Sequence, residues 1–487
     1  MVFSSLFFIY AFLPLCMLTY WAVRSIKAKN TVLLIFSLIF YTWGEPIYVG
    51  LLIFMTFCDW ILALAIEKQV DKQLSRKILI LLCCVINLGI IGVFKYTGFF
   101  CENLQNIFGF PETIPQIILP IGISFYTFQL LSYVIDVYRK EVPAQKNFFW
   151  LLLYSSLFYQ CIAGPIVRYA DVEKELSHRK TNLNEITQGI SRFTIGLAKK
   201  ALIANTCGSL SDTLLVSDAL IATSADTALT ELSTRSVAGL WLGVLFYSLQ
   251  IYLDFSAYSD MAIGMGLMVG FHFKENFNYP YIAKSVTDFW RRWHISLSTF
   301  FRDYVYIPLG GNRKGTLKTY RNILVVWLLT GLWHGASWNF VLWGLFFCVF
   351  LVIEKLGLLK ILEKIPALFS HAYLLIVVFL GWILFRFSDF RFIPVVLKGM
   401  FGLNGNTVFD FETKTLILSN VFFIIVAVLS VFPIVKKLSE KLKPKKPNTP
   451  YSFAHGIISA IIPVALLILS TLSLVGDSYN PFLYFQF

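Results

Sequence analysis

Residues 289–315 read FWRRWHISLSTFFRDYVYIPLGGNRKG, and residues 327–344 read WLLTGLWHGASWNFVLWG. The two segments place His294 and His334 among arginines, tryptophans and glycines, within a chain that is otherwise strongly apolar. An ionisable side chain at membrane depth is costly, so it usually marks a functional site. We therefore expect the functional centre of the chain within residues 286–344.

Composition assigns the chain to the membrane proteins. Of its 487 residues, 57% are hydrophobic and only 14% are charged, whereas a soluble protein has about a quarter charged residues. Apolar runs of about twenty residues recur along the chain, each long enough to cross a bilayer as a helix. The sequence thus predicts an all-α, polytopic integral membrane protein, organised as a single domain over residues 1–487.

The apolar runs predict about eleven membrane spans, together with re-entrant or interfacial helices. Residues 186–215 are only moderately apolar, and a tilted span, an interfacial helix and a re-entrant piece all remain open for them. The predicted spans cover residues 3–23, 31–43, 47–66, 78–94, 117–135, 148–166, 237–257, 336–354, 371–387, 416–435 and 454–475.

The net charge of +13 comes from short basic groups between the apolar runs. Such groups are typical of the cytoplasmic loops of membrane proteins and argue against nucleic acid as a partner. Residues 24–29 carry three basic groups, residues 67–77 carry four against two acids, and residues 139–146 carry three against one. With the lysines at 436–446, they predict a multi-pass protein whose N- and C-termini are both extracytoplasmic.

The segment 289–305 has helical spacing, with Trp290, His294, Leu297 and Phe301 on one face. A helix of this kind suits a membrane interface, where it either serves function or merely anchors the chain. The turn at 308–315 follows, and its Arg313 and Lys314 suit the phosphates of a nucleotide-bearing donor. A plain basic cytoplasmic loop explains the same two residues.

His334 gives the sharper signal. Gly331 and Gly335 flank it, and glycines allow a ligand or another backbone to approach closely. Histidine is the side chain best suited to take a proton from a hydroxyl near neutral pH. The alternative is a histidine that only bonds a neighbouring helix. The sequence has no hydrolase motif and no cluster of metal ligands, so we expect no metal.

The two central segments, the opening MVFSS, the FYTWGEP turn at 40–46 and the closing YNPFLYFQF together resemble the membrane-bound O-acyltransferases. The resemblance covers nearly the whole chain and is strongest to the bacterial branch that acetylates polysaccharides such as alginate. It implies a helical bundle with a central funnel or tunnel that leads to a catalytic histidine. His334 would be the general base, and His294 would orient a reacting group. The substrate-binding residues we expect are Trp290, Arg291, Trp293, Arg302, Asp303, Arg313, Lys314, Trp333 and Asn339.

The same resemblance implies a reaction. An acetyl group would pass from cytoplasmic acetyl-CoA, with no bound cofactor, across the bacterial cell membrane to an extracytoplasmic polysaccharide acceptor, through an extracytoplasmic acetyltransferase partner. Four alternatives stay open: D-alanyl transfer to teichoic acid, O-acetylation of peptidoglycan, acylation of a lipid or protein, and a glycan exporter that makes no covalent bond.

Overall fold

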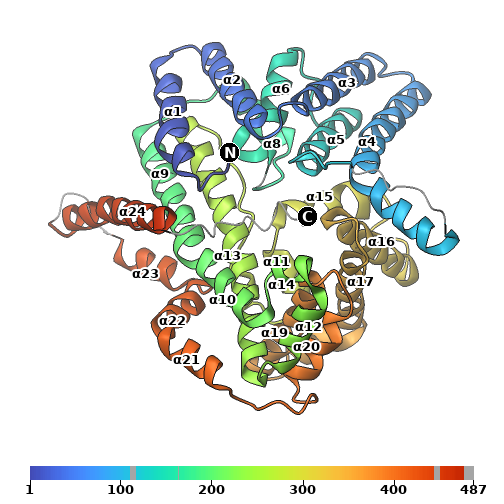
Figure 1. Ribbon diagram of the computed structural model, residues 1–487. Coiled ribbons are helices and arrows are strands. Elements are labelled where there is room, and N and C mark those ends of the chain that lie inside the picture. Colours follow the sequence, from blue (N-terminus) through green and yellow to red (C-terminus); the bar gives the residue numbers. More distant parts are fainter. Residues whose placement is uncertain (110–116, 163, 444–449, 477–487) are drawn as a thin grey trace. The chain divides into compact units, whose positions relative to one another are not determined.

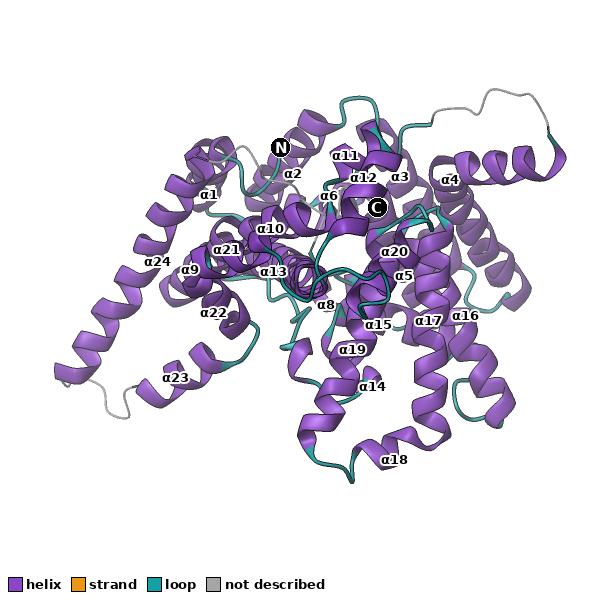
Figure 2. Cartoon of the chain, turned by 60° about the horizontal axis from the view of Figure 1, so that its bottom comes forward, coloured by secondary structure: helices purple, strands orange, loops and turns teal. Residues whose placement is uncertain are grey.

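The computed structural model describes residues 1–109, 117–162, 164–443 and 450–476. These residues form helices joined by loops, with no strand among them (Figure 2). The predicted all-α class is therefore confirmed. The C-terminal tail and Lys445 and Lys446, which entered the orientation argument, lie outside the described residues.

Five helices in the described part of the chain are long and apolar enough to cross a membrane. They are α3 (Val49–Lys68), α4 (Gln73–Phe108), α13 (Val237–Val269), α19 (Ala367–Arg386) and the Gly456–Gly476 part of α24 (Pro450–Gly476). A bent pair, α21 (Phe411–Ser419) and α22 (Val421–Ser430), makes a sixth if it is one span, with 70° between its two helices. A multi-pass protein is thus supported, and the count of about eleven spans stays a prediction.

The helices group into two compact units. Unit 1 combines residues 1–193, 258–276 and 295–311. An aromatic cluster lies in its core, with Phe8, Phe12, Phe40 and Phe158 ring against ring. Besides α3, α4 and the end of α13, it contains η1 (Phe8–Phe12), α1 (Leu13–Ala22), α2 (Ile26–Gly44), α5 (Ile123–Arg139), α6 (Phe148–Ser156), α7 (Phe158–Cys161), α8 (Tyr169–Ser177), most of α9 (Leu183–Ala198), α15 (Ile295–Phe301) and η4 (Arg302–Tyr306).

Unit 2 combines residues 194–257, 277–294 and 312–487. Its centre is a packed group of four helices, α14 (Val286–Arg292), α16 (Thr316–His334), α17 (Trp338–Ile353) and α19 (Figure 1). Further elements are η2 (Lys199–Ala204), α10 (Asn205–Leu215), α11 (Asp218–Thr223), α12 (Ala225–Thr234), the first part of α13, η3 (Pro280–Ile282), η5 (Glu354–Leu358), α18 (Leu359–Leu362), α20 (Phe392–Met400), α21, α22, α23 (Ile434–Leu442) and α24.

The ambiguous segment 186–215 is helical, with the π-helical η2 between α9 and α10. It is not among the five candidate spans. Lys200 in η2 is buried and pairs with the buried Asp254 of α13 at 2.8 Å. A buried charge is tolerated when a partner of opposite charge compensates it, and this pairing explains how a lysine fits into an apolar packing surface.

The predicted continuous helix over 289–305 is wrong. Helix α14 ends at Arg292, α15 begins at Ile295, and His294 lies in the break with a φ of +43°. In a continuous helix the Arg292 carbonyl would accept from the amide four residues later. Here it accepts from the Asn278 N–H at 2.9 Å, so the helix cannot continue.

The predicted span at 148–166 is also interrupted, since α6 ends at Ser156 and α7 is a single turn.

Candidate active site

The start of α14 is held by a buried carboxylate. Glu354 is fully buried, and its two oxygens accept hydrogen bonds from the Val286 N–H (2.6 Å), the Thr287 N–H (2.8 Å) and the Thr287 hydroxyl (2.6 Å). The Tyr373 hydroxyl donates to the same carboxylate at 3.2 Å. A negative charge beside the N–H groups of a helix start is stabilising. Glu354 therefore fixes the short helix that leads to His294.

His294 occupies a strained backbone position. Its φ of +43° lies in the left-handed region, which few residues other than glycine adopt. Its imidazole is 2% exposed and meets Phe255 of α13 edge to face, with 4.7 Å between the ring centroids. Burial lowers the pKa of His294 to about 3, so the ring is neutral under ordinary conditions. It is thus suited to hydrogen bonding and unsuited to carrying a positive charge.

His334 is the last residue of α16, where the chain turns back into α17. Close packing of the two helices requires glycine at two positions. A Cβ atom at Gly331 would lie 2.4 Å from the Phe340 carbonyl oxygen, and one at Gly344 would lie 2.4 Å from the Trp327 carbonyl oxygen. The sequence left open whether these glycines admit a ligand or another backbone. At Gly331 the structure shows the backbone of α17.

Aromatic rings surround the His334 imidazole, which is 8% exposed. The centroids of Trp333 and Trp343 lie 5.0 Å away, and that of Phe385 in α19 lies 5.3 Å away. Such rings exclude water, and electrostatic interactions are stronger in a site of low dielectric. This setting suits a proton transfer that must not be lost to solvent.

Trp333 connects the two histidines. Its ring lies 5.7 Å from the His294 ring and 5.0 Å from the His334 ring, centroid to centroid. Forty residues separate the histidines in the sequence, yet both contact one indole within unit 2. The structure thus brings three predicted site residues into one cluster, which we call the histidine cluster.

Trp290 and Trp293 extend the aromatic packing around the histidine cluster. Trp290 meets Trp343 at 5.5 Å, and Trp343 in turn contacts His334. Trp293 is buried and lies 5.0 Å from Trp382 of α19. Both indoles pack against protein rings, and their role in substrate binding stays a prediction.

Asn339 lies at the start of α17 and is buried. Its amide nitrogen donates to the backbone oxygens of Leu384 (3.4 Å) and Phe385 (3.3 Å) at the end of α19. Because the Phe385 ring contacts His334, Asn339 helps to hold one wall of the histidine cluster.

The predicted basic residues of unit 2 have exposed side chains, unlike the buried histidines. Arg313 and Lys314 are exposed on the turn before α16, and Arg291 is exposed on α14. Helix α16 has 19 residues, which correspond to about 28 Å of helical rise. Arg313 and Lys314 therefore lie far along this helix from His334, and only an extended ligand reaches both.

Arg302 and Asp303 belong to unit 1, whereas the histidine cluster belongs to unit 2. Their side chains pair at 2.6 Å, and Asp303 also accepts from Arg168 at 2.8 Å. Partial burial opposes ionisation of Asp303, but the hydrogen bonds from Arg302 and Arg168 outweigh it and lower the pKa of the carboxyl. Their role in substrate binding stays a prediction.

The sequence reasoning missed Glu354, Phe255 and Phe385. Glu354 had a detectable signal, because it is an acid at the end of the apolar run 336–354. Phe255 and Phe385 had none, since nothing distinguishes them from the many other phenylalanines of the chain.

Comparison with known proteins supplies independent information. The model of the membrane-bound O-acyltransferase family matches residues 139–393. A probable alginate O-acetylase from Azotobacter vinelandii is 38% identical over the full length of both chains. A peptidoglycan O-acetyltransferase from Helicobacter pylori is 34% identical over 83% of this chain and 80% of its own. A teichoic acid D-alanyltransferase from Bacillus subtilis is 28% identical over 47% of this chain and 57% of its own.

Proposed function

Because the chain belongs to the membrane-bound O-acyltransferase family and is an acyltransferase, we propose that it transfers acetyl groups for O-acetylation of an extracytoplasmic polysaccharide such as alginate. The donor in this proposal is cytoplasmic acetyl-CoA, and an extracytoplasmic acetyltransferase completes delivery to the polymer. The observation that carries the proposal is the histidine cluster, with His334 enclosed by aromatic rings and sharing Trp333 with His294.

His334 acts as the general base. Its imidazole accepts the proton of an acceptor hydroxyl as the oxygen attacks the carbonyl carbon of the thioester. The new C–O bond forms, the C–S bond breaks, and the thiolate leaving group takes the proton from the imidazolium. His294 stays neutral and orders a reacting group by hydrogen bonding, consistent with its burial.

Arg313 and Lys314 contact the donor phosphates in this proposal. They are exposed at the far end of α16 from His334, so a phosphate bound there is roughly 28 Å from the base along the helix. A donor with a long arm between its phosphates and its thioester, such as an acyl-CoA, covers much of that separation.

The relatives favour acetyl over D-alanyl as the transferred group. Two relatives named for O-acetylation match most or all of the chain, whereas the named D-alanyltransferase matches under half of it. Peptidoglycan is the second candidate acceptor, because the peptidoglycan O-acetyltransferase is 34% identical over 83% of the chain.

The test uses the full-length protein in proteoliposomes with acetyl-CoA labelled in its acetyl group. Alginate oligomers and peptidoglycan fragments are offered as acceptors in separate reactions, each with and without membrane extract as a source of partner. We expect transfer of label to one of the glycans or to a partner protein, and loss of that transfer in His334→Ala. The exposed His178→Ala is the matched control, since it removes the same side chain from the surface of unit 1.

Retained transfer in a well-folded His334→Ala protein would remove the assigned base. Transfer from a D-alanyl carrier protein, with none from acetyl-CoA, would replace the proposed donor.

A further inference from the structure

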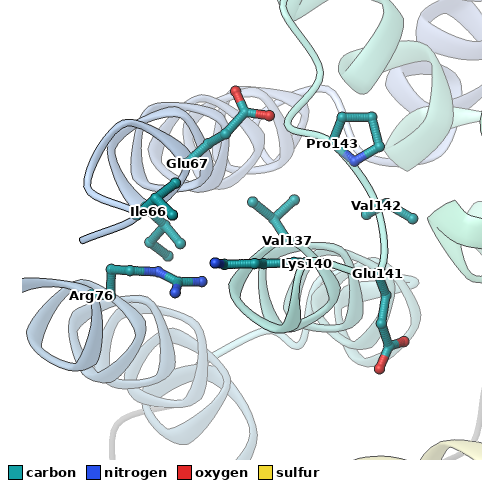
Figure 3. A pocket seen from close by; sticks show the side chains of 9 residues that line it. Ile66, Glu67, Arg76, Val137, Lys140, Glu141, Val142 and Pro143 are labelled. Carbon is teal, nitrogen blue, oxygen red and sulfur yellow. The ribbon is translucent and has the colours of Figure 1, made fainter. Parts of the chain in front are cut away.

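A pocket of ≈ 280 Å³ lies in unit 1, where α3 ends, α4 begins and α5 ends (Figure 3). Nothing in the proposed acyl transfer uses it. Its volume is slightly smaller than that of common ligand pockets in proteins, which start at about 300 Å³. We call it the loop pocket.

Two basic side chains converge in the loop pocket. Figure 3 shows the ammonium group of Lys140 and the guanidinium group of Arg76 pointing toward each other, while the carboxylates of Glu67 and Glu141 point away from them. Two like charges that face each other across a cavity repel, and a shared anion removes this repulsion.

The acids on the rim of the loop pocket are occupied by other cations. One oxygen of Glu67 accepts from the Ala144 N–H at 2.9 Å, and the other pairs with Lys146. Glu141 faces Arg139 at 3.9 Å. Neither acid pairs with Lys140 or Arg76 among the described residues, so the interior of the pocket is electropositive.

Arg76 has a structural task that uses only part of its guanidinium. Its Nη2 donates to the Tyr138 carbonyl oxygen at the end of α5, and the group lies 4.9 Å from the Tyr138 ring centroid. Its Nε is buried and has no hydrogen-bond partner among the described residues. The Lys140 backbone N–H caps α5 by donating to the Val137 carbonyl oxygen at 3.0 Å, but its ammonium group forms no hydrogen bond or ion pair within the described part of the chain. Donors therefore remain on both residues.

The remaining wall of the loop pocket is apolar. It is formed by Ile66, Val70, Val137, Val142 and Pro143. Both α3 and α4 are candidate membrane spans, so the end of one and the start of the other mark the level of the lipid headgroups. A pocket with two cations beside apolar side chains at that level suits an amphiphilic anion.

We propose that the loop pocket binds a phosphate group, through the ammonium of Lys140 and the guanidinium of Arg76. Two sources supply this chemistry at a membrane surface: the phosphodiester of an anionic lipid, and free phosphate. Charge-assisted hydrogen bonds to an oxyanion are the strongest polar contacts that such side chains make. The proposal is independent of the acyl transfer proposed above.

Lys140 offers an informative variant. It caps α5 with a φ of +64°, a left-handed conformation for which glycine is the usual residue. Lys140→Gly thus removes the charge and at the same time relieves the backbone, so the variant should fold at least as well as the parent. The matched control is Lys77→Gln, which removes one positive charge from an exposed position on α4 next to Arg76.

The experiment measures binding of two probes to the purified full-length chain in detergent. Phosphatidylglycerol adducts are counted by native mass spectrometry, with phosphatidylcholine as the neutral lipid, and inorganic phosphate is titrated by thermal shift. We expect Lys140→Gly to bind one of the anions roughly tenfold more weakly than Lys77→Gln does, the loss expected for one charge-assisted hydrogen bond.

Loss confined to phosphatidylglycerol identifies the lipid as the source, and loss confined to inorganic phosphate identifies the soluble anion. If Lys140→Gly binds both probes as tightly as Lys77→Gln, or if the parent protein binds neither probe, the proposal is overturned.

Discussion

At the scale of single residues, the conformation of His294 restricts what can replace it. The left-handed region that it occupies is tolerated by asparagine but is strained for β-branched residues. We expect His294→Val to be less stable than His294→Asn by about 1–3 kcal/mol, although valine is the more apolar side chain for a buried site. Thermal unfolding of the two variants in detergent measures the difference. Equal stability, or a more stable valine variant, would show that the backbone does not require the left-handed conformation.

Gly331 shows how closely the helices around His334 approach. A Cβ at this position meets the Phe340 carbonyl oxygen at 2.4 Å, so Gly331→Ala must push α17 away from α16. We expect a loss of about 1–3 kcal/mol of stability, as in other overpacked sites, together with reduced transfer activity. Gly89→Ala is the control, because a Cβ there meets no atom within 4 Å. Its helix should be unchanged or slightly more stable, and equal behaviour of the two variants in thermal unfolding would contradict the packing argument.

At the scale of elements, Glu354 connects α14 to the end of α17. Glu354→Gln keeps the shape of the side chain but replaces one acceptor oxygen by a donor, which then faces backbone N–H groups. We expect about 2 kcal/mol of destabilisation and faster hydrogen exchange at the amides of Val286 and Thr287. Glu363→Gln is the control, since Glu363 is exposed on the nearby loop. Unchanged exchange at the start of α14 would remove the proposed role of Glu354.

The elements also show what the sequence could predict. The long apolar helices α3, α4, α13 and α19 correspond to predicted spans, because their apolar runs contain few competing signals. The break at His294 was not predictable, since the i, i+4 spacing of Trp290 and His294 continues through it. What ends α14 is the bond from the Asn278 N–H to the Arg292 carbonyl, a contact between segments fourteen residues apart that periodicity does not encode.

The candidate site, too, could be predicted from the sequence only in part. Residue type and flanking glycines were sufficient to select His334, and the structure adds that Gly331 admits a neighbouring helix. The common neighbour Trp333 depends on the way α14 and α16 pack, which the sequence does not give. Aromatic walls such as Phe385 depend on helix packing in the same way.

At the scale of the whole molecule, the distribution of charge predicts how the chain lies in the membrane. The loop pocket and the Arg313–Lys314 turn both lie in basic loops, which we expect on the cytoplasmic side. In the proposed reaction, a nucleotide-bearing donor would meet the exposed cations of the turn, and the acceptor would approach from the opposite side. Orientation is therefore the property on which the proposed direction of transfer depends.

Single cysteines test this orientation directly. The half-buried native cysteines Cys58, Cys84 and Cys101 are first replaced by serine to remove background labelling. Lys443→Cys then reports on the lysine-rich loop, and Ile47→Cys reports on the predicted opposite face, where the native side chain is 83% exposed. We expect a membrane-impermeant maleimide to label Ile47→Cys in intact cells, and to label Lys443→Cys only after permeabilisation, because basic loops are retained on the cytoplasmic side. Labelling of Lys443→Cys in intact cells, with Ile47→Cys protected, would invert the orientation and place the Arg313–Lys314 turn on the wrong side for the proposed donor.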